Sequence, residues 1–101
     1  IYYYMKFEIS NSKLEQIIFK YLDNRNFIIK ETDDNYYFLD RTTDFLAFSY
    51  NKSKYLCLIY YEVFKEIRNF FSIDDTKTIK DVITKYVKNK LNVEVSSTVI
   101  T

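Results

Sequence analysis

Four short runs rich in β-branched and aromatic residues follow one another in the middle of the chain and limit what it can fold into. They cover residues 27–31, 36–40, 45–50 and 55–61. Short polar segments with Asn, Asp, Ser and Thr separate these runs, and segments of this length and composition form turns between neighbouring strands. The middle of the sequence therefore predicts an antiparallel four-stranded meander.

Three further segments have the spacing of amphipathic helices. Residues 13–24, 62–71 and 75–90 repeat apolar side chains at positions i, i+3, i+4 and i+7. This spacing collects the apolar side chains into one stripe on each helix, which is the stripe that a folded domain buries. The sequence therefore predicts three helices that pack on the meander.

The two ends of the chain alternate polar and apolar residues. Residues 1–9 and 93–101 are expected to form extended terminal strands or arms, and pairing between them is one arrangement. The predicted element order is β-α-β-β-β-β-α-α-β, which defines an α+β fold. No linker, repeat or low-complexity block interrupts residues 1–101, so we expect a single domain.

Neither side of the predicted sheet is polar. In the second run Tyr36 and Phe38 alternate with Tyr37 and Leu39, and the third and fourth runs show the same pattern. A sheet with one face in water alternates apolar and polar residues. We therefore expect either cover on both faces or an exposed aromatic patch, and such a patch on a monomer marks an interaction site.

Composition excludes several kinds of chemistry. The chain has no Gly, which phosphate-binding loops need, and no His for a nucleophile system or an imidazole acid–base. Its one cysteine, Cys57, lies in an apolar run and is expected to be an inert core thiol. A lone Cys and no signal-like segment fit a reducing compartment, and with no long apolar run they predict a chain that is neither secreted nor membrane-bound.

Charge is nearly balanced but unevenly placed. Fifteen basic and 14 acidic residues give a formal charge of +1, so the whole chain has no strong attraction for nucleic acid or anionic lipid. Residues 31–44 are predominantly acidic, whereas residues 76–90 are rich in lysine. Opposed patches suit self-association or a charged partner, and two ordinary solvated faces are the alternative.

Carboxylates also raise the question of a metal enzyme. The pairs Asp33-Asp34 and Asp74-Asp75 are expected to serve a turn and a helix N-cap, respectively. A metal nuclease needs carboxylates and a lysine that converge on a sheet, and Asp40, Glu62 and Lys65 follow strand ends in this sequence. Their spacing does not unite them, so we predict no enzyme, no cofactor and no small-molecule substrate.

Nucleic-acid binding is the main alternative function. Sheet tyrosines beside lysines can stack bases, and the helix–sheet–helix order is similar to that of double-stranded-RNA-binding domains. Residues 72–75 (SIDD) stand where those domains carry lysines before the last helix, and the carboxylates of Asp74 and Asp75 disfavour phosphate. The residues of this alternative, besides the sheet tyrosines, are Lys52, Lys54, Lys77, Lys80 and Lys88.

Both ends of the chain carry a family resemblance. Residues 5–10 (MKFEIS) lead into Leu14-Glu15 and Tyr21-Leu22, and residues 70–74 (FFSID) lead through Val82-Ile83 to residues 91–95 (LNVEV). Together they resemble small uncharacterised proteins of tailed phages with AT-rich genomes, and the abundance of Lys, Asn, Ile, Tyr and Phe agrees with such a genome. The resemblance leaves the central sheet unmatched, and Tyr86 stands where such proteins typically carry Trp. It implies a phage setting, with the protein in the host cytoplasm or the virion, and transfers no site residue.

The sequence thus predicts a non-enzymatic protein–protein interaction module. In a phage setting it is expected to be a virion or assembly component, or a small inhibitor of a host protein. The partner is another protein or a second copy of the chain, contacted through an aromatic sheet face and the extended termini. The predicted contact residues are Tyr2, Tyr3, Tyr4, Tyr36, Tyr50, Tyr55 and Tyr61.

Overall fold

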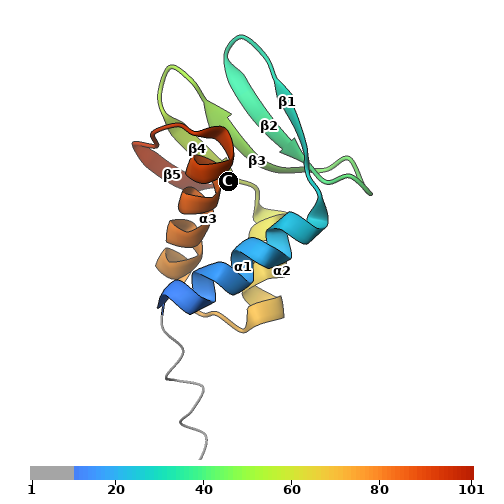
Figure 1. Ribbon diagram of the computed structural model, residues 1–101, viewed down its shortest axis with the longest axis vertical. Coiled ribbons are helices and arrows are strands. Elements are labelled where there is room, and N and C mark those ends of the chain that lie inside the picture. The colour runs from blue at the N-terminus through green and yellow to red at the C-terminus, as the bar shows by residue number, and fades with distance from the viewer. Residues whose placement is uncertain (1–10) are drawn as a thin grey trace, which may run out of the picture.

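The chain folds into three helices and a five-stranded sheet (Figure 1). The computed structural model describes residues 11–101, so the predicted strand 1–9 lies outside the described residues. The α+β class and the predicted helices are confirmed. In chain order the elements are α1 (Asn11–Arg25), β1 (Ile28–Glu31), β2 (Asn35–Leu39), β3 (Leu46–Asn51), β4 (Leu56–Ile59), α2 (Tyr61–Phe71), α3 (Thr76–Leu91) and β5 (Ser97–Ile100).

The sheet contains the predicted four-stranded antiparallel meander and adds a fifth strand to it. Its strand order is β1-β2-β3-β4-β5, and only the first four strands form the antiparallel meander. The segment predicted as a terminal arm, residues 93–101, places β5 beside β4 in parallel. Two helices separate β4 from β5 in the chain, and this crossover brings the chain back to the same end of the sheet, so that β5 runs in the direction of β4.

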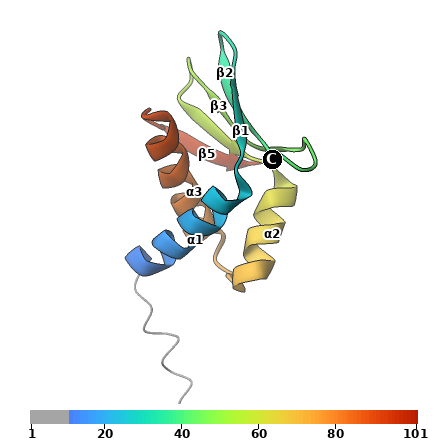
Figure 2. The same ribbon diagram turned by 45° about the vertical axis from the view of Figure 1, so that its right-hand side comes forward.

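One hydrophobic core lies between the helices and one face of the sheet, which we call the helix side (Figure 2). Phe38, Phe48 and Ile59 form a cross-strand row on this side and are almost fully buried. Ile18 and Leu22 of α1 contribute to the same core, as do the apolar stripes of α2 and α3. The buried residues of α2 and α3 are Val63, Phe64, Ile67, Ile79, Val82, Ile83, Tyr86 and Val87.

The helices end without glycine. Asn26, Ser72 and Asn92 have φ angles of 54–56°, which is the left-handed conformation that usually closes a helix. At Ser72 and Asn92 the backbone N–H groups donate to carbonyls of the last helical turn. Asparagine tolerates this conformation better than most residues, so two of the three ends use the best substitute that a chain without glycine has.

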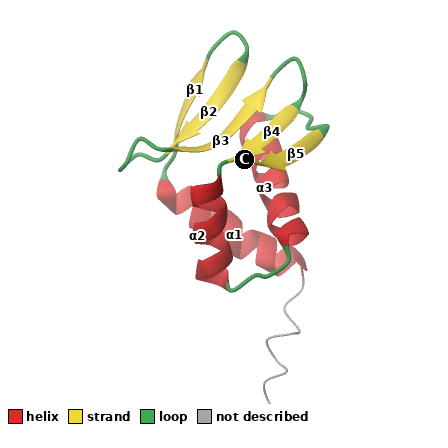
Figure 3. Ribbon diagram, turned by 180° about the vertical axis from the view of Figure 1, so that it is seen from behind, coloured by secondary structure: helices red, strands yellow, loops and turns green. Residues whose placement is uncertain are grey.

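The other face of the sheet has no helix on it among residues 11–101. From behind, β3, β4 and β5 lie in front of α3 (Figure 3). Apolar side chains occupy this face and are partly exposed, Val99 most of all at 46%. We call this surface the uncovered face and define it by Tyr37, Leu39, Leu56, Leu58, Tyr60 and Val99.

Candidate protein interaction surface

The uncovered face has a continuous row of side chains across the sheet. Tyr37 of β2 pairs with Ser49 of β3, which pairs with Leu58 of β4, which pairs with Val99 of β5. Lys30 of β1 completes the row. The core cluster formed by the described residues includes neither Tyr37, Leu58 nor Val99, so their apolar area faces outward.

A second row lies beside the first. Leu39 pairs with Ile28 of β1, and the Tyr60 N–H donates to the Ala47 carbonyl at 3.0 Å. A register shift between Phe38 and Leu39 marks a β-bulge, which brings β3 past β2 at this point. Ala47 lies next to this shift and is almost fully buried as part of the core cluster.

Hydrogen bonds fix the tyrosine rings of this face. The Asn35 Nδ2 donates to the Tyr37 hydroxyl at 3.0 Å, and the Ser49 and Tyr60 hydroxyls lie 3.4 Å apart. Asn51 Nδ2 donates in turn to Asn35 Oδ1 at 3.2 Å. Rings held in this way lose little conformational entropy when a partner binds, which favours association.

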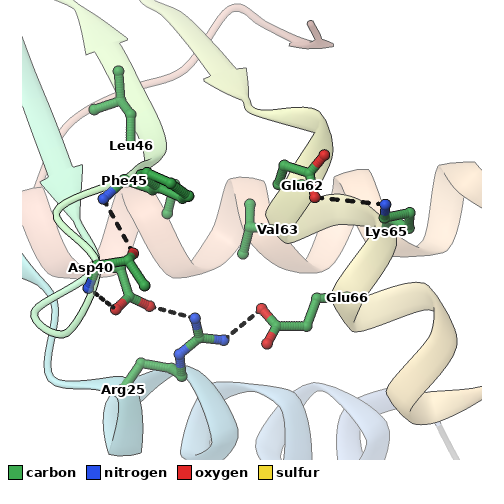
Figure 4. A pocket seen from close by; sticks show the side chains of 10 residues that line it. Arg25, Asp40, Phe45, Leu46, Glu62, Val63, Lys65 and Glu66 are labelled. Atoms are coloured by element: carbon green, nitrogen blue, oxygen red, sulfur yellow. Dashed lines mark hydrogen bonds and ion pairs between the residues drawn. The ribbon is translucent and has the colours of Figure 1, made fainter.

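A pocket of about 330 Å³ lies between the end of α1, the start of β3 and α2 (Figure 4). Phe45, Leu46 and Val63 line it together with Ala47. Phe45 is 68% exposed, which is unusual for a large apolar side chain beside a pocket. Apolar side chains of β3 and α2 thus share this pocket.

Arg25 lies on the other wall of this pocket, between two carboxylates (Figure 4). Its guanidinium pairs with Asp40, and with Glu66 at 2.7 Å. Partial burial lowers the pKa of Arg25, but the hydrogen bonds and charges of Glu66 and Asp40 outweigh this effect and raise it above its ordinary value. The hydrogen bond from Arg25 lowers the pKa of Asp40 against the effect of burial. This ion-pair cluster ties α1 to the end of β2 and to α2.

The three residues considered for a metal nuclease come together at the same pocket. Asp40, Glu62 and Lys65 all line it, so the structure unites residues whose spacing did not. Glu62 pairs with Lys65 at 3.5 Å, and Asp40 is engaged by Arg25. In the part of the chain that the structure describes, no group of three or more acidic or Cys side chains could hold a metal ion. Catalysis by a metal held on these carboxylates therefore gains no support here.

Three of the predicted contact tyrosines gather around a different hollow. Tyr36, Tyr50 and Tyr55 line a pocket of about 310 Å³ at the opposite end of the sheet. Tyr50 is 2% exposed and donates to the Glu94 carbonyl at 2.5 Å, whereas Tyr55 is 52% exposed. Tyr36 and Tyr50 share the helix side with Phe38 and Phe48, so these rings do not belong to the uncovered face.

The other predicted contact residues are dispersed. Tyr61 starts α2 and is 46% exposed, while Tyr2, Tyr3 and Tyr4 lie outside the described residues. Three of the lysines of the nucleic-acid alternative form ion pairs, Lys52 with Glu31, Lys77 with Asp81 and Lys88 with Glu94. Lys54 is exposed in the β3–β4 turn, and Lys80 lies half-buried on α3.

The predicted contact residues include two tyrosines of the helix side, Tyr36 and Tyr50, and none of the residues that define the uncovered face. The polar residues of the strands contained a partial signal for the set that lies outside the core. Lys30 and Ser49 share a row with Tyr37 and Leu58, whereas Phe38 and Phe48 have only apolar neighbours in their row. The polar residues paired on the helix side, Glu31 and Thr98, lie on the edge strands, whereas Ser49 of the outer set lies on the central strand β3.

Cys57 is fully buried, and desolvation raises the pKa of its thiol to about 12, as expected for an inert core thiol. None of the helices between residues 11 and 101 is long and apolar enough to span a membrane. No family model, curated protein or solved structure matches the chain.

Proposed function

We propose that this chain is a non-enzymatic protein–protein interaction module that binds its partner through the uncovered face. The row that runs from Tyr37 through Leu58 to Val99 is the observation that carries the proposal. Sheet faces that stay in water normally carry polar side chains. A face that keeps tyrosine and leucine outside the core gains free energy when a partner removes it from water, at about 25 cal/mol per Å² of apolar area.

The chemistry of the uncovered face suits a protein partner. Tyrosine is enriched at the centres of protein interfaces, because its ring buries a large apolar area while its hydroxyl stays hydrogen-bonded. The exposed Phe45, beside the pocket at the start of β3, adds further apolar area outside the core. In the phage setting that the sequence resemblance implies, the partner is a second copy of the chain, another virion or assembly protein, or a host protein that the module inhibits.

Replacing an apolar residue of the uncovered face with a charged one tests the proposal. Leu58→Glu places a carboxylate in the middle of the row, and Ile17→Glu places one on α1, where Ile17 is 42% exposed. We expect sedimentation velocity to show association of the unmodified chain between micromolar and submillimolar concentration. Leu58→Glu should abolish this association, and Ile17→Glu should leave it unchanged.

A photocrosslinking amino acid at position 58 extends the test to partners other than the chain itself. We expect it to give one defined crosslinked product in phage-infected cells, and the same amino acid at position 17 to give none. A chain that stays monomeric throughout and gives no product from position 58 contradicts the proposal.

Nucleic-acid binding remains the second candidate because one of its lysines, Lys52, lies beside three of the sheet tyrosines. Lys52 Nζ lies 4.8 Å from the centre of the Tyr36 ring, in the same hollow as Tyr50 and Tyr55. Exposed rings beside a cation can stack single-stranded bases. The carboxylate of Glu31 pairs with Lys52 at 2.6 Å, however, and a phosphate must compete with it.

A further inference from the structure

The two edges of the sheet differ in how they are protected. Strands at the edges of natural sheets commonly carry charged residues, which prevent further strands from adding. The edge strand β1 has the sequence IIKE, with Lys30 and Glu31 exposed. The opposite edge strand, β5, has the sequence STVI with no charge. Among residues 11–101, no strand pairs with the outer edge of β5.

Backbone hydrogen bonds show which groups of β5 point outward. The Thr101 N–H donates to the Ile59 carbonyl at 2.9 Å, and the Thr101 carbonyl accepts from the Tyr61 N–H at 3.0 Å. Successive residues of a strand direct their N–H and C=O groups to opposite sides. Ile100 and Thr98 therefore direct both of their backbone groups away from β4, toward the free edge.

A groove of about 310 Å³ lies beside this edge, between α3 and β5. The Thr84 and Thr98 hydroxyls, 2.5 Å apart, connect the two elements along it. Lys77 and Lys80 line the groove with a single carboxylate, Asp81, which pairs with Lys77 at 2.7 Å. No ion pair between the described residues includes Lys80. The groove thus has a surplus of positive charge beside an open strand edge.

We propose that the outer edge of β5 binds an extended, acidic segment of a partner protein, which adds to the sheet as a sixth strand. Backbone groups of Thr98 and Ile100 bind the segment, and Lys80 selects its carboxylate side chains. A second copy of the chain fits less well. Antiparallel pairing of two β5 strands brings the lysines of both α3 helices together, which costs electrostatic energy.

A labelled peptide of alternating glutamate and valine is the probe for this edge, with a lysine–valine peptide of equal length as its counterpart. We expect fluorescence anisotropy to show saturable binding of the glutamate peptide alone, weakened by salt. Lys80→Glu should weaken this binding at least about fivefold, as expected for a contact between opposite charges. The matched control is Lys20→Glu on the exposed side of α1, which should leave it unchanged.

Amide exchange measured by NMR tests the pairing itself. The amides of Thr98 and Ile100 should exchange rapidly in the free protein and slowly with the glutamate peptide bound. The amides of Val99 and Thr101 should be protected in both states, because they face β4. This pattern separates strand addition from mere attraction of the peptide to surface lysines.

Four results overturn the proposal. The first is that the glutamate peptide shows no saturable binding at millimolar concentration, and the second is that the lysine peptide binds equally well. The third is that the Lys80→Glu variant binds the glutamate peptide as tightly as the unmodified chain. The fourth is that the amides of Thr98 and Ile100 are protected from exchange in the free protein. The last result means that residues 1–9 or a second copy already occupy the edge. The test is independent of the uncovered face, since Leu58→Glu should still bind the glutamate peptide.

Discussion

At the scale of single residues, Arg25 connects parts of the chain that are far apart in sequence. Its side chain is 25% exposed, and it holds the Asp40 carboxylate, which is 11% exposed. Asp40 also accepts hydrogen bonds from the Thr42 and Thr43 amides, at 2.9 and 3.2 Å. One carboxylate thus orders the β2–β3 loop and fastens it to α1, beside the pocket between α1, β3 and α2.

Asp40→Asn should lower the free energy of unfolding by about 2 kcal/mol at neutral pH, because it removes a charge-assisted hydrogen bond but keeps an acceptor for both loop amides. The pKa of Asp40 lies below its ordinary value of 3.8 in the folded chain. Its contribution is therefore fully present above that value and is lost as pH falls through the folded pKa. Urea unfolding at neutral pH and below the folded pKa measures both effects.

The exposed Glu62 provides the control for this prediction. Its side chain is 74% exposed, and its pair with Lys65 is expected to contribute little. Glu62→Gln should therefore leave the unfolding free energy nearly unchanged at either pH. An equal loss in Glu62→Gln and Asp40→Asn, or a difference that does not shrink in acid, contradicts the role given to Asp40.

At the scale of elements, caps and turns set where each helix begins and ends. Asp75 precedes α3, and its carboxylate accepts from the Lys77 N–H at 3.1 Å and from the Thr78 hydroxyl at 2.9 Å. The sequence offered Asp74 and Asp75 as equal candidates for this cap. Only the backbone geometry at Asp75, with φ −81° and ψ 106°, distinguishes between them.

Asp75→Ala should lower the free energy of unfolding by about 1 kcal/mol, because the first turn of α3 loses its acceptor. Asp74→Ala provides the matched control, since Asp74 is exposed next to the cap. We expect the Asp74→Ala variant to unfold at nearly the urea concentration of the unmodified chain. A larger loss in Asp74→Ala than in Asp75→Ala contradicts this assignment of the cap.

At the scale of the whole molecule, the opposed charge patches predicted from the sequence are dispersed. The acidic run is split by β2, with Glu31 at one end of the sheet and Asp40 at the other. Lysines of α3 pair with carboxylates of other segments, Lys85 with Glu15 and Lys90 with Asp23. Charges neutralised locally produce only a weak field at a distance.

This distribution predicts weak binding of nucleic acid. We expect no change in the anisotropy of labelled single-stranded DNA or duplex RNA with micromolar protein at about 50 mM salt, where phosphate contacts are strongest. A salt-dependent change that Tyr55→Ala abolishes contradicts the expectation and favours the second candidate function. Tyr61→Ala is the control, since Tyr61 is similarly exposed but lies outside the hollow of Tyr36 and Tyr55.

Local patterns determined much of the fold. The spacing of Ile79, Val82, Ile83, Tyr86 and Val87 predicted α3, and all five are buried there. The polar turns between the strand runs predicted the antiparallel pairs of β1 to β4. Such features depend on neighbours along the chain, because helix and strand periodicities and turn conformations are set within a few residues.

Only the tertiary structure decided where β5 lies and which side of the sheet stays open. The sequence of residues 93–101 predicts a strand, and this strand fits an extended arm and a position beside β4 equally well. The two helices that separate β4 from β5 in the chain select the latter and make the pair parallel. Likewise, both alternating sets of strand residues are apolar, and the core determines which set is buried. Both choices depend on contacts between residues distant in the chain, and no local periodicity records those contacts.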